Sequence, residues 1–597
     1  MSDNPAEAVL AGWLSQLEAK LAARDWSGAS TLFEPDGYWR DLVAFTWSIV
    51  TVQGQGSIAT MLASCGERTA ATAWQVEPGA ATTSEGIAEG FITFETSTGR
   101  GRGHLRIKDG RARTVLTTLQ AIKGHEEKRG PNRERGTTHG AIRGRIAWGE
   151  ARAEERAALG RTQQPFCLII GGGQGGIALG ARLKRLGVPA LVVDRLAKPG
   201  DTWRSRYQSL CLHDPVWYDH LPYLPFPDHW PVFIPKDRMG DWLEAYVQIM
   251  DIDYWGSTTV TSARPDPQSG NWTVTLERAG ETLTLHPQHV VLATGMSGFP
   301  NVPHFPGQES FKGTQTHSSA HHASKPYEGK RCVIIGANNS AHDIAADLWE
   351  HGASVTMVQR SSTLVVRSST LMEKSWGRLF SEEALAKGIT TDKADLLHAS
   401  VPYAMLPAIQ KPIYEEIAER DRDLYNRLRA VGFMLDFGED GTGLGLKYLR
   451  RGSGYYIDVG ACDLVASSEI ALKSGVDVTH ITPDGVSLSD GSHLPCDLIV
   501  YATGYGPMNQ WIGALMGEDI EARVGKVWGL GSDTTHDPGP WEGELRNMWK
   551  PTAQDGLWLH GGNLQQSRHY SLYLALQLKA RQLSLPVAVY QPPGGSA

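Results

Sequence analysis

The residues with the clearest chemical meaning are Gly171, Gly173 and Gly176, which have the spacing G-x-G-x-x-G. The apolar run 166–170 precedes them and a helical pattern follows, so they lie where a buried strand turns into a helix. The first glycine permits a tight turn, the second lets the backbone approach a pyrophosphate, and the third brings helix and strand close together. This pattern predicts a dinucleotide-binding loop.

A second strand, 191–193, ends at Asp194, about 20 residues after the first glycine, where an acid is placed for a ribose hydroxyl. Strand, helix, strand and acid in register favour a bound nucleotide over a glycine-rich loop without a function. The residues that we assign to this site are Gly171, Gly173, Gln174, Gly175, Gly176, Asp194 and Arg195.

A second unit of this kind begins with the apolar run 331–335 and Gly336, but Asn338 and Ala341 replace its other two glycines. Asparagine tolerates positive φ better than most residues, and alanine keeps helix and strand nearly as close. Pyrophosphate binding at the helix N-terminus is therefore retained. Asn339 and Ser340 can donate to phosphate or ribose.

The next strand, 354–359, ends at Arg360, where an NAD site would carry an acid. A cation at this position, with Ser361 beside it, suits the 2′-phosphate of NADPH, although a surface arginine is the alternative. We therefore expect NADPH rather than NADH in the second unit.

The composition excludes several function classes. The chain has 597 residues, 20% of them charged, and a net charge of −8, so we expect no nucleic-acid partner. Its first residues lack a signal peptide and no apolar run is long enough to span a membrane, so we expect a cytoplasmic protein. The cysteines form no C-x-x-C pair, which argues against a metal or dithiol-redox site; they are Cys65, Cys167, Cys211, Cys332, Cys462 and Cys496.

Residues 1–125 have the pattern of a small α+β domain. Asp109-Gly110 between two strand-like runs predicts a hairpin turn. The segment 23–49 resembles the cone-shaped SnoaL-like (nuclear-transport-factor-like) superfamily. Such cones can hold catalytic acids, but we favour a structural role for Arg40 and Asp41 over a catalytic one. We expect a dimerisation or lid element, with a ligand-binding or assembly module as the alternative. The apolar repeat of an amphipathic helix is formed by Leu10, Trp13, Leu14, Leu17 and Leu21.

Two further segments resemble a known family. The stretch 200–246 and the pattern Phe311, Gly313 and His317 are similar to the flavin-containing monooxygenases, above all to the YUCCA-type branch that acts on indole-3-pyruvate. The resemblance covers about residues 164–580, and His321 departs from it because the family has an aromatic residue there. It implies an α/β fold with two Rossmann-like dinucleotide-binding domains, for FAD and NADPH, after the small α+β cone.

The pattern of the first 125 residues, the mixed charge of the segment after it and the family resemblance together give a domain order. The expected parts are 1–125 (SnoaL-like domain), 126–163 (charged linker), 164–325 (FAD-binding domain, first part), 326–496 (NADPH-binding domain with a substrate-cap insertion) and 497–597 (FAD-binding domain, second part).

The family's motifs give roles to further residues. His213, Asn338 and His317 are candidates for the catalytic site. An imidazole at His213 could tune the protonation of a flavin peroxide, and the equal alternative is that it only hydrogen-bonds the isoalloxazine or the backbone. His317 is expected to link the domains near the nicotinamide. Asn563, Leu564 and Gln565 would face the flavin pyrimidine ring at a helix N-terminus. The remaining expected cofactor contacts are Thr202, Trp203, Arg204, His213, Asp214, Ala293, Thr294, Gly295, Ala502, Thr503 and Gly504.

The activity that the resemblance implies is a monooxygenase reaction. NADPH would reduce FAD, which reacts with O2 to give a C4a-(hydro)peroxide that attacks a small organic substrate. Attack at a carbonyl, of the Baeyer-Villiger type on ketones or α-keto acids, is favoured over oxygenation of nitrogen or sulfur because of His213. The alternative is an NADPH oxidase that releases hydrogen peroxide. We expect a homodimer without a membrane partner.

Overall fold

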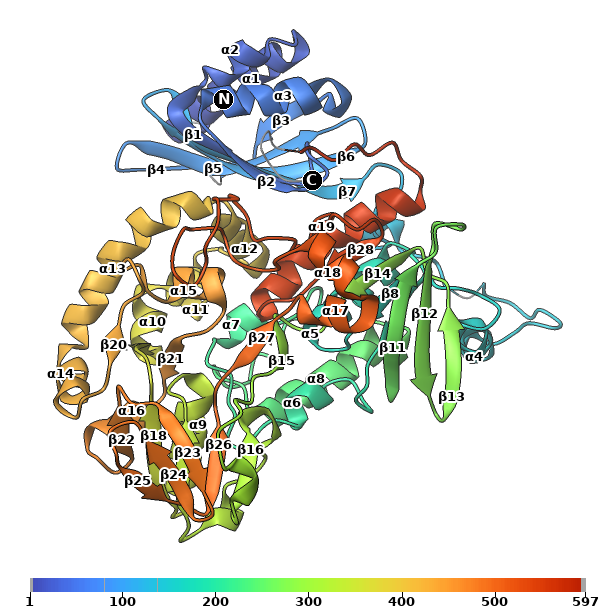
Figure 1. The fold of residues 1–597 in the computed structure, drawn as a ribbon. Helices are drawn as coiled ribbons and strands as arrows, with labels where there is room; N and C mark the ends of the chain where they lie inside the picture. The colour runs from blue at the N-terminus through green and yellow to red at the C-terminus, as the bar shows by residue number, and fades with distance from the viewer. Residues whose placement is uncertain (1–3, 80, 137, 592–597) are drawn as a thin grey trace.

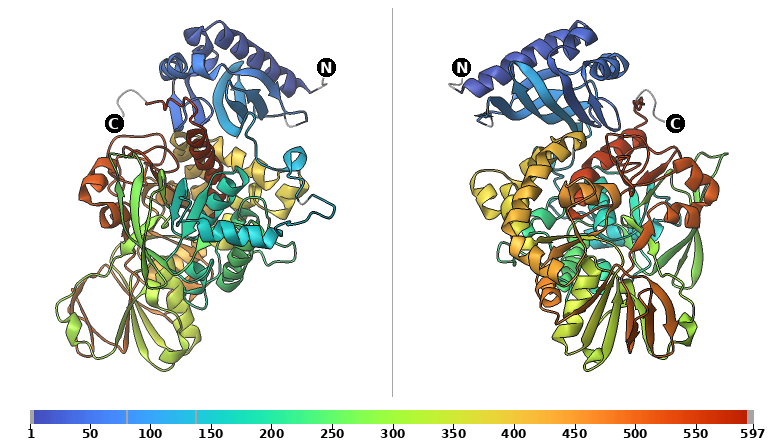
Figure 2. Two further views of the ribbon diagram at one scale, coloured as in Figure 1. Left: turned by 90° about the vertical axis from the view of Figure 1, so that its right-hand side faces the viewer. Right: turned by 60° about the vertical axis from the view of Figure 1, so that its left-hand side comes forward.

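The computed structural model describes residues 4–79, 81–136 and 138–591. A first domain lies on a larger body that contains two nucleotide-binding units (Figure 1). Two further views show that the chain after the last helix runs back to this first domain (Figure 2), where the Tyr590 amide donates to the Thr46 carbonyl. The last described residues of the chain therefore contact the first domain.

The first domain packs three helices on one face of a curved seven-stranded sheet, with the other face toward the larger body (Figures 1 and 2). The five apolar residues predicted for the first helix are buried in α1. Asp109 and Gly110 form the predicted hairpin turn, both with positive φ. The elements are α1 (Pro5–Ala22), α2 (Trp26–Ser30), β1 (Phe33–Leu42), β2 (Ile49–Gln53), α3 (Gln55–Thr69), β3 (Thr72–Val76), β4 (Thr82–Ser84), β5 (Ile87–Glu95), β6 (Gly99–Lys108) and β7 (Arg111–Ile122).

The linker contains one α-helix, α4 (Trp148–Ala158). Its Arg152 is buried and donates to Asp251 at 2.9 Å and to Asp253 at 2.6 Å. The linker is therefore anchored on the first nucleotide-binding unit.

That first unit is a parallel sheet of order β10-β9-β8-β14-β28, to which a three-stranded antiparallel sheet is attached. Helix α5 (Gln174–Arg185) follows β8, and Gly187 just beyond its end has φ +65°, which is typical of a glycine after a helix C-terminus. The strands are β8 (Cys167–Ile170), β9 (Ala190–Val193), β10 (Tyr254–Trp255), β11 (Thr258–Pro265), β12 (Trp272–Arg278), β13 (Glu281–Leu285), β14 (His289–Leu292) and β28 (Leu557–Leu559). Its other helices are α6 (Asp201–Arg204), α7 (Val216–Asp219), α8 (Lys236–Ile249) and α19 (Leu564–Gln582).

The second unit is a parallel sheet of order β16-β26-β17-β18-β22. Two of its strands, β16 (Thr314–His317) and β26 (Leu498–Tyr501), lie outside the predicted range 326–496, so both predicted boundaries are wrong. The physical reason is that the Ala-Thr-Gly segment 502–504 ends a strand of its own unit, and the chain leaves the sheet only after it. The other strands and helix are β17 (Arg331–Ile335), α9 (Asn339–Glu350), β18 (Ser354–Gln359) and β22 (Ala471–Ser474), with the hairpins β23 (Val478–Thr482), β24 (Gly485–Leu488) and β25 (His493–Pro495).

The insertion in this unit has its own small parallel sheet, β20-β19-β21, with helices around it. It lies between the second unit and the first domain (Figure 1). Its elements are β19 (Thr363–Arg367), α10 (Ser368–Lys374), α11 (Glu382–Ala386), α12 (Thr391–Ala399), α13 (Leu406–Arg420), α14 (Arg422–Ala430), β20 (Leu435–Asp436), α15 (Gly443–Arg451), β21 (Tyr455–Asp458) and α16 (Ala461–Ala466).

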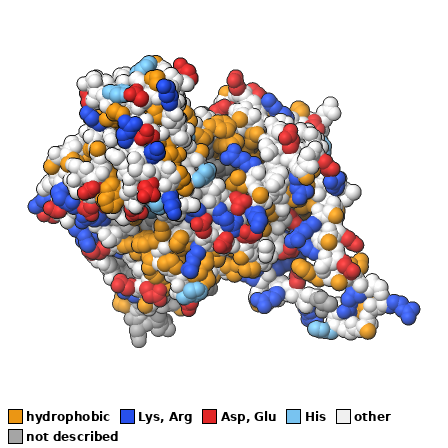
Figure 3. Space-filling view, turned by 90° about the horizontal axis from the view of Figure 1, so that it is seen from below, with side chains coloured by type: hydrophobic (Ala, Val, Ile, Leu, Met, Phe, Trp, Pro, Cys, Tyr) orange, Lys and Arg blue, Asp and Glu red, His pale blue; other side chains and the backbone are white. Residues whose placement is uncertain are grey.

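The two units are connected by a short antiparallel pair, β15 (Ser297–Pro300) and β27 (Tyr505–Pro507). Two short helices, α17 (Gln510–Met516) and α18 (Glu518–Val524), follow it. In the view from below, acidic and basic side chains are interspersed over the surface and apolar side chains gather near its middle (Figure 3). Among the described residues, no helix has the length and apolar character needed to cross a membrane.

Candidate functional site

The first nucleotide-binding loop has the backbone that the sequence predicts. Gly171 has φ +111°, and a Cβ there would lie 2.3 Å from the Ala293 carbonyl oxygen. A Cβ on Gly176 would lie 1.9 Å from the Gly171 carbonyl oxygen, so helix and strand touch. Gly173 differs, because a Cβ there would have no atom nearer than Thr202 Oγ1 at 4.0 Å. The protein does not fill the space in front of Gly173, where a pyrophosphate would approach.

Several polar atoms around this loop are buried and have no hydrogen-bond partner among the described residues. Both imidazole nitrogens of His560 and the Ser567 hydroxyl are such atoms. His560 Nε2 and Ser567 Oγ lie 3.6 and 3.7 Å from the position of a Cβ on Gly175. The Trp203 indole nitrogen and the Thr294 hydroxyl are also without partners. Buried polar groups normally have partners, so this donor set fits a polar cofactor such as FAD.

Of the other predicted FAD contacts, one lies against the loop and two point away from it. The Asp194 carboxylate accepts hydrogen bonds from the amides of Gly172, at 2.6 Å, and Leu196, at 2.7 Å, and thus lies against the loop. Arg195 is exposed. The Arg204 guanidinium pairs with the carboxylates of Asp201, Asp241 and Glu244. The last two belong to α8 (Lys236–Ile249), so the Arg204 side chain points toward that helix.

The second loop repeats the plan of the first. Gly336 has φ +133°, and a Cβ there would lie 2.3 Å from the Ala502 carbonyl oxygen, as Gly171 does from Ala293. Asn338 has φ −101°, so the expectation that it uses positive φ is wrong. The reason is that only the first glycine of each loop makes the sharp turn. Ala341 is buried where the third glycine would be.

The two Ala-Thr-Gly segments thus lie against the two loops. Residues 293–295 follow β14 and residues 502–504 follow β26, and Gly295 and Gly504 both have positive φ. The family resemblance implies that these segments contact the cofactors. The structure adds that each one also packs on the first glycine of its own nucleotide loop.

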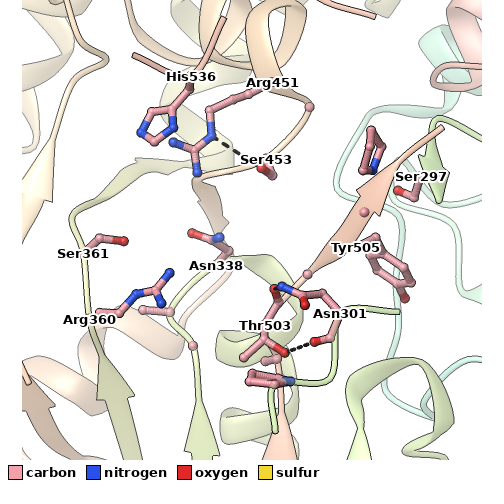
Figure 4. A pocket seen from close by; sticks show the side chains of 18 of the residues that line it. Ser297, Asn301, Asn338, Arg360, Ser361, Arg451, Ser453, Thr503, Tyr505 and His536 are labelled. Carbon is pink, nitrogen blue, oxygen red and sulfur yellow. Dashed lines mark hydrogen bonds between the residues drawn. The ribbon is translucent and has the colours of Figure 1, made fainter. Parts of the chain in front are cut away.

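A cavity of about 530 Å³ lies over the second loop. Arg360 and Ser361 line one side of it, and Arg451 and Ser453, from the end of α15 (Gly443–Arg451), line the other, with Asn338 between them (Figure 4). The other labelled residues of the lining are Ser297, Asn301, Thr503, Tyr505 and His536 (Figure 4). The predicted Arg360 site is thus part of a real cavity of nucleotide size.

Sequence reasoning missed Arg451. Burial lowers the pKa of Arg451, and the carboxylates that act on it lie beyond ion-pair distance. Neither Arg451 nor Arg360 makes an ion pair with a carboxylate of the described residues. Two guanidinium groups without counterions that face one cavity call for an anion such as phosphate. The only sequence signal was a cation at a helix C-terminus, which is common for other reasons.

Other predicted residues around the second loop make protein contacts. The Asn339 side-chain oxygen accepts from the Ile457 amide at 2.9 Å and so anchors the insertion. His317 contacts the Ser319 hydroxyl at 2.8 Å and the Gly504 carbonyl at 3.0 Å through its two ring nitrogens. Burial lowers the pKa of His317, which favours the neutral ring. His317 therefore has the geometry of a structural residue that fixes Gly504, within the second unit.

His213 lies at the contact between the two units. Its Nε2 is 3.5 Å from Asp343 Oδ2, on α9 of the second unit, and Tyr207 donates to the same oxygen at 2.6 Å. Asp214, the next residue, is surrounded by protein, and burial raises the pKa of its carboxyl. The sequence did not single out Asp343, since its position in a helix carries no motif of its own.

The N-terminus of α19 (Leu564–Gln582) is capped by Asn563, whose side chain accepts from the Gln566 amide at 2.9 Å. The Asn563 amide group also donates to the Tyr218 hydroxyl at 3.0 Å, and its backbone amide donates to Tyr448 at 3.0 Å. Leu564 is buried, and Gln565 turns away to donate to Asp395 at 3.0 Å. Of the three predicted residues, Asn563 is the one at the helix end.

Comparisons with known proteins agree with this geometry. A family model described as pyridine nucleotide-disulphide oxidoreductase matches residues 168–399. The rice (Oryza sativa subsp. japonica) indole-3-pyruvate monooxygenase YUCCA1 is 30% identical over 356 residues, which are 59% of this chain and 79% of that protein. The chain belongs to the flavin-containing monooxygenase family. It is therefore a flavoprotein oxidoreductase of the monooxygenase type.

Further comparisons place this flavin-containing monooxygenase among its relatives. The probable indole-3-pyruvate monooxygenase YUCCA3 of Arabidopsis thaliana is 28% identical to this chain. The matched part is 57% of this chain and 72% of that protein. A solved structure titled as OTEMO in complex with FAD and NADP is 18% identical in sequence and has a TM-score of 0.50. The matched part is 71% of this chain and 86% of the OTEMO chain. The family is FAD- and NADPH-dependent, which matches the two nucleotide loops.

Proposed function

We propose that this chain uses NADPH and O2 to insert one oxygen atom into a small organic substrate, through a C4a-(hydro)peroxyflavin. The observation that carries the proposal is the pair of nucleotide loops built to one plan, with Gly171 against Ala293 and Gly336 against Ala502. Two dinucleotide sites in one chain serve electron transfer between two cofactors. One oxygen atom enters the product, the other leaves as water, and NADPH supplies both electrons.

We assign FAD to the first loop and NADPH to the second. The space at Gly173, the buried polar atoms of Trp203 and Thr294, and the N-terminus of α19 suit a flavin nucleotide. Arg360 and Ser361, with Arg451 across the cavity, suit a phosphate-rich cofactor and favour NADPH over NADH. The bound flavin would supply the oxygen chemistry, while the chain orients both cofactors and controls protons.

We infer a carbonyl compound, a ketone or an α-keto acid, as the substrate class. Two observations support this inference. The relatives are named for indole-3-pyruvate, an α-keto acid. His213 lies between the two units with the Asp343 carboxylate beside it, and this pair can hold a proton on the imidazole. Oxygenation of nitrogen or sulfur is the alternative that a substrate panel separates.

The test is to reduce the purified holoenzyme with NADPH, mix it with oxygen and follow the flavin spectrum against ketones, α-keto acids, sulfides and amines. We expect an oxygenated product from at least one carbonyl compound, with one product formed per NADPH consumed. Oxygen uptake with and without catalase measures how many electrons leave as hydrogen peroxide. Complete recovery as peroxide with every compound would replace the proposal with an NADPH oxidase.

A further inference from the structure

Asp343 joins two segments that come from different nucleotide-binding units. It stands on α9, which begins at the second nucleotide loop, and its Oδ2 accepts from Tyr207 at 2.6 Å and lies 3.5 Å from His213 Nε2. Tyr207 and His213 belong to the segment that follows α6 in the first unit. A single carboxylate oxygen therefore fixes a phenol and an imidazole across the contact between the units.

This contact is shielded from water. The Asp343 and His213 side chains are 9% and 13% exposed, and Asp343 Oδ1 has no hydrogen-bond partner among the described residues. Electrostatic interactions are stronger in such surroundings than at the surface, so the charge of Asp343 acts strongly on the imidazole.

Other groups face His213 from each neighbouring element. Asp214 follows it in the chain, Asp458 lies at the end of β21 (Tyr455–Asp458), and the Tyr456 ring is 6.4 Å away, edge-on. Burial opposes a charge on His213, but the carboxylates outweigh burial and raise its pKa, with Asp343 contributing most. The neighbouring carboxylates thus favour the charged form of the imidazole.

The two acidic neighbours of His213 connect it to groups of both nucleotide-binding units. Asp214, beside it, acts electrostatically on Tyr218 and Tyr448, the two phenols that contact Asn563 at the α19 N-terminus. On the other side, Asp343 is on the helix whose N-terminus carries the second nucleotide loop. A proton held at His213 is therefore next to Asp214, which acts on the α19 N-terminus, and next to Asp343, which stands on the helix of the second loop.

We propose that Asp343 is a positioning residue, which holds His213 as a fixed imidazolium at the contact between the two nucleotide-binding units. The inference rests on the proposed monooxygenase function and deepens it. The imidazolium keeps a proton available where oxygen is activated, and Asp343 sets the pH above which that proton is lost. Because the His213 pKa is raised, the ion pair is complete at low pH and is lost as the pH rises through that value.

The experiment titrates His213 in the FAD-bound enzyme by NMR with labelled histidine, and His213→Gln assigns the signal. In the wild type we expect a midpoint above the ordinary value of about 6.5. Asp343→Asn keeps the shape but removes the charge, and should lower the midpoint by about one pH unit or more. Asp343→Glu should restore a high midpoint.

Two control variants separate the charge from general damage. Tyr207→Phe removes the hydrogen bond to Asp343 but leaves its charge, and should keep the midpoint above about 6.5. Asp347→Asn removes a carboxylate one turn further along α9, where it contacts Ser324 and His351, and should leave the midpoint unchanged. Bound flavin absorbance checks that each variant is folded.

A functional measurement accompanies the titration. The fraction of NADPH electrons released as peroxide is followed against pH, and in Asp343→Asn its rise should move to lower pH together with the His213 midpoint. An unchanged midpoint in Asp343→Asn would overturn the inference. So would a wild-type midpoint below about 6.5, which needs no variant. A wild type that oxygenates nothing would refute the proposed function alone, because the titration still reads His213 directly.

Discussion

At the scale of single residues, Gly173 and Gly176 have opposite constraints although both belong to one loop. A Cβ at Gly176 would lie 1.9 Å from the Gly171 carbonyl oxygen, whereas at Gly173 the nearest atom would be Thr202 Oγ1 at 4.0 Å. The fold therefore requires Gly176, and only a ligand requires Gly173.

This difference gives a matched pair of variants. Gly173→Ala should unfold at nearly the wild-type urea concentration but retain much less FAD, because the new methyl group occupies the approach of the pyrophosphate. Gly176→Ala should lower the stability of the protein itself, since backbone cannot move aside cheaply. Flavin content and urea unfolding measure the two effects. Full FAD retention in Gly173→Ala would place the cofactor elsewhere.

Arg360 allows a second test at this scale. Arg360→Ala removes a cation from the wall of the cavity over the second loop, and should raise KM for NADPH at least tenfold while changing KM for NADH little. Only NADPH carries the 2′-phosphate, so NADH is the internal control in steady-state kinetics. Equal effects on both cofactors would remove Arg360 from the phosphate site.

At the scale of elements, the N-terminus of α19 is held by its cap. Asn563 accepts from the Gln566 amide and also donates to Tyr218, so the cap joins the helix to α7 (Val216–Asp219). The helix N-terminus with its positive dipole end thereby has a fixed direction. In the proposed enzyme this end faces the flavin.

Asn563→Ala should lower the free energy of unfolding by about 1 kcal/mol and weaken FAD retention. The control is Asn4→Ala, which removes the equivalent cap of α1, where Asn4 accepts from the Ala6 amide at 3.0 Å. That variant should lose a similar stability but keep its FAD. Urea unfolding and flavin release on dilution measure both. Equal FAD retention in the two variants would contradict a flavin-facing role of α19.

At the scale of the whole molecule, one buried arginine joins the first domain to the rest. Arg40 is 1% exposed and donates to Glu544 at 2.7 and 2.8 Å, to the Ala399 carbonyl at 2.7 Å and to Tyr570 at 3.0 Å. Tyr570 belongs to α19 and Ala399 ends α12 (Thr391–Ala399). The structural role expected for Arg40 is thus a contact between domains.

Arg40→Ala should cost about 3–5 kcal/mol of stability, because it leaves Glu544 buried without its counterion. Arg24→Ala removes the exposed pair of Arg24 with Glu67 in the same domain, where both side chains are 64% exposed, and should change stability little. Thermal and urea unfolding compare the two. A loss in Arg40→Ala no larger than in Arg24→Ala would mean that the domain is only loosely attached.

The sequence by itself determined what depends on neighbouring residues. The strand-turn-helix spacing at Gly171 and Gly336, the hairpin at Asp109-Gly110 and the cation at Arg360 are local patterns, because their geometry is set within one β-α-β or β-turn-β unit. The α+β character of the first part was also readable, although its superfamily stays a prediction.

Tertiary structure alone decided the contacts between distant segments. Arg40 meets Glu544 across 504 positions, and Asp343 meets Tyr207 across 136. Arg451 reaches the cavity only because the insertion folds back over the second loop. No periodicity records which buried charge meets which, since that choice follows from how the sheets and the insertion pack. The sequence therefore determined the two nucleotide loops, and the packing of domains decided which side chains surround them.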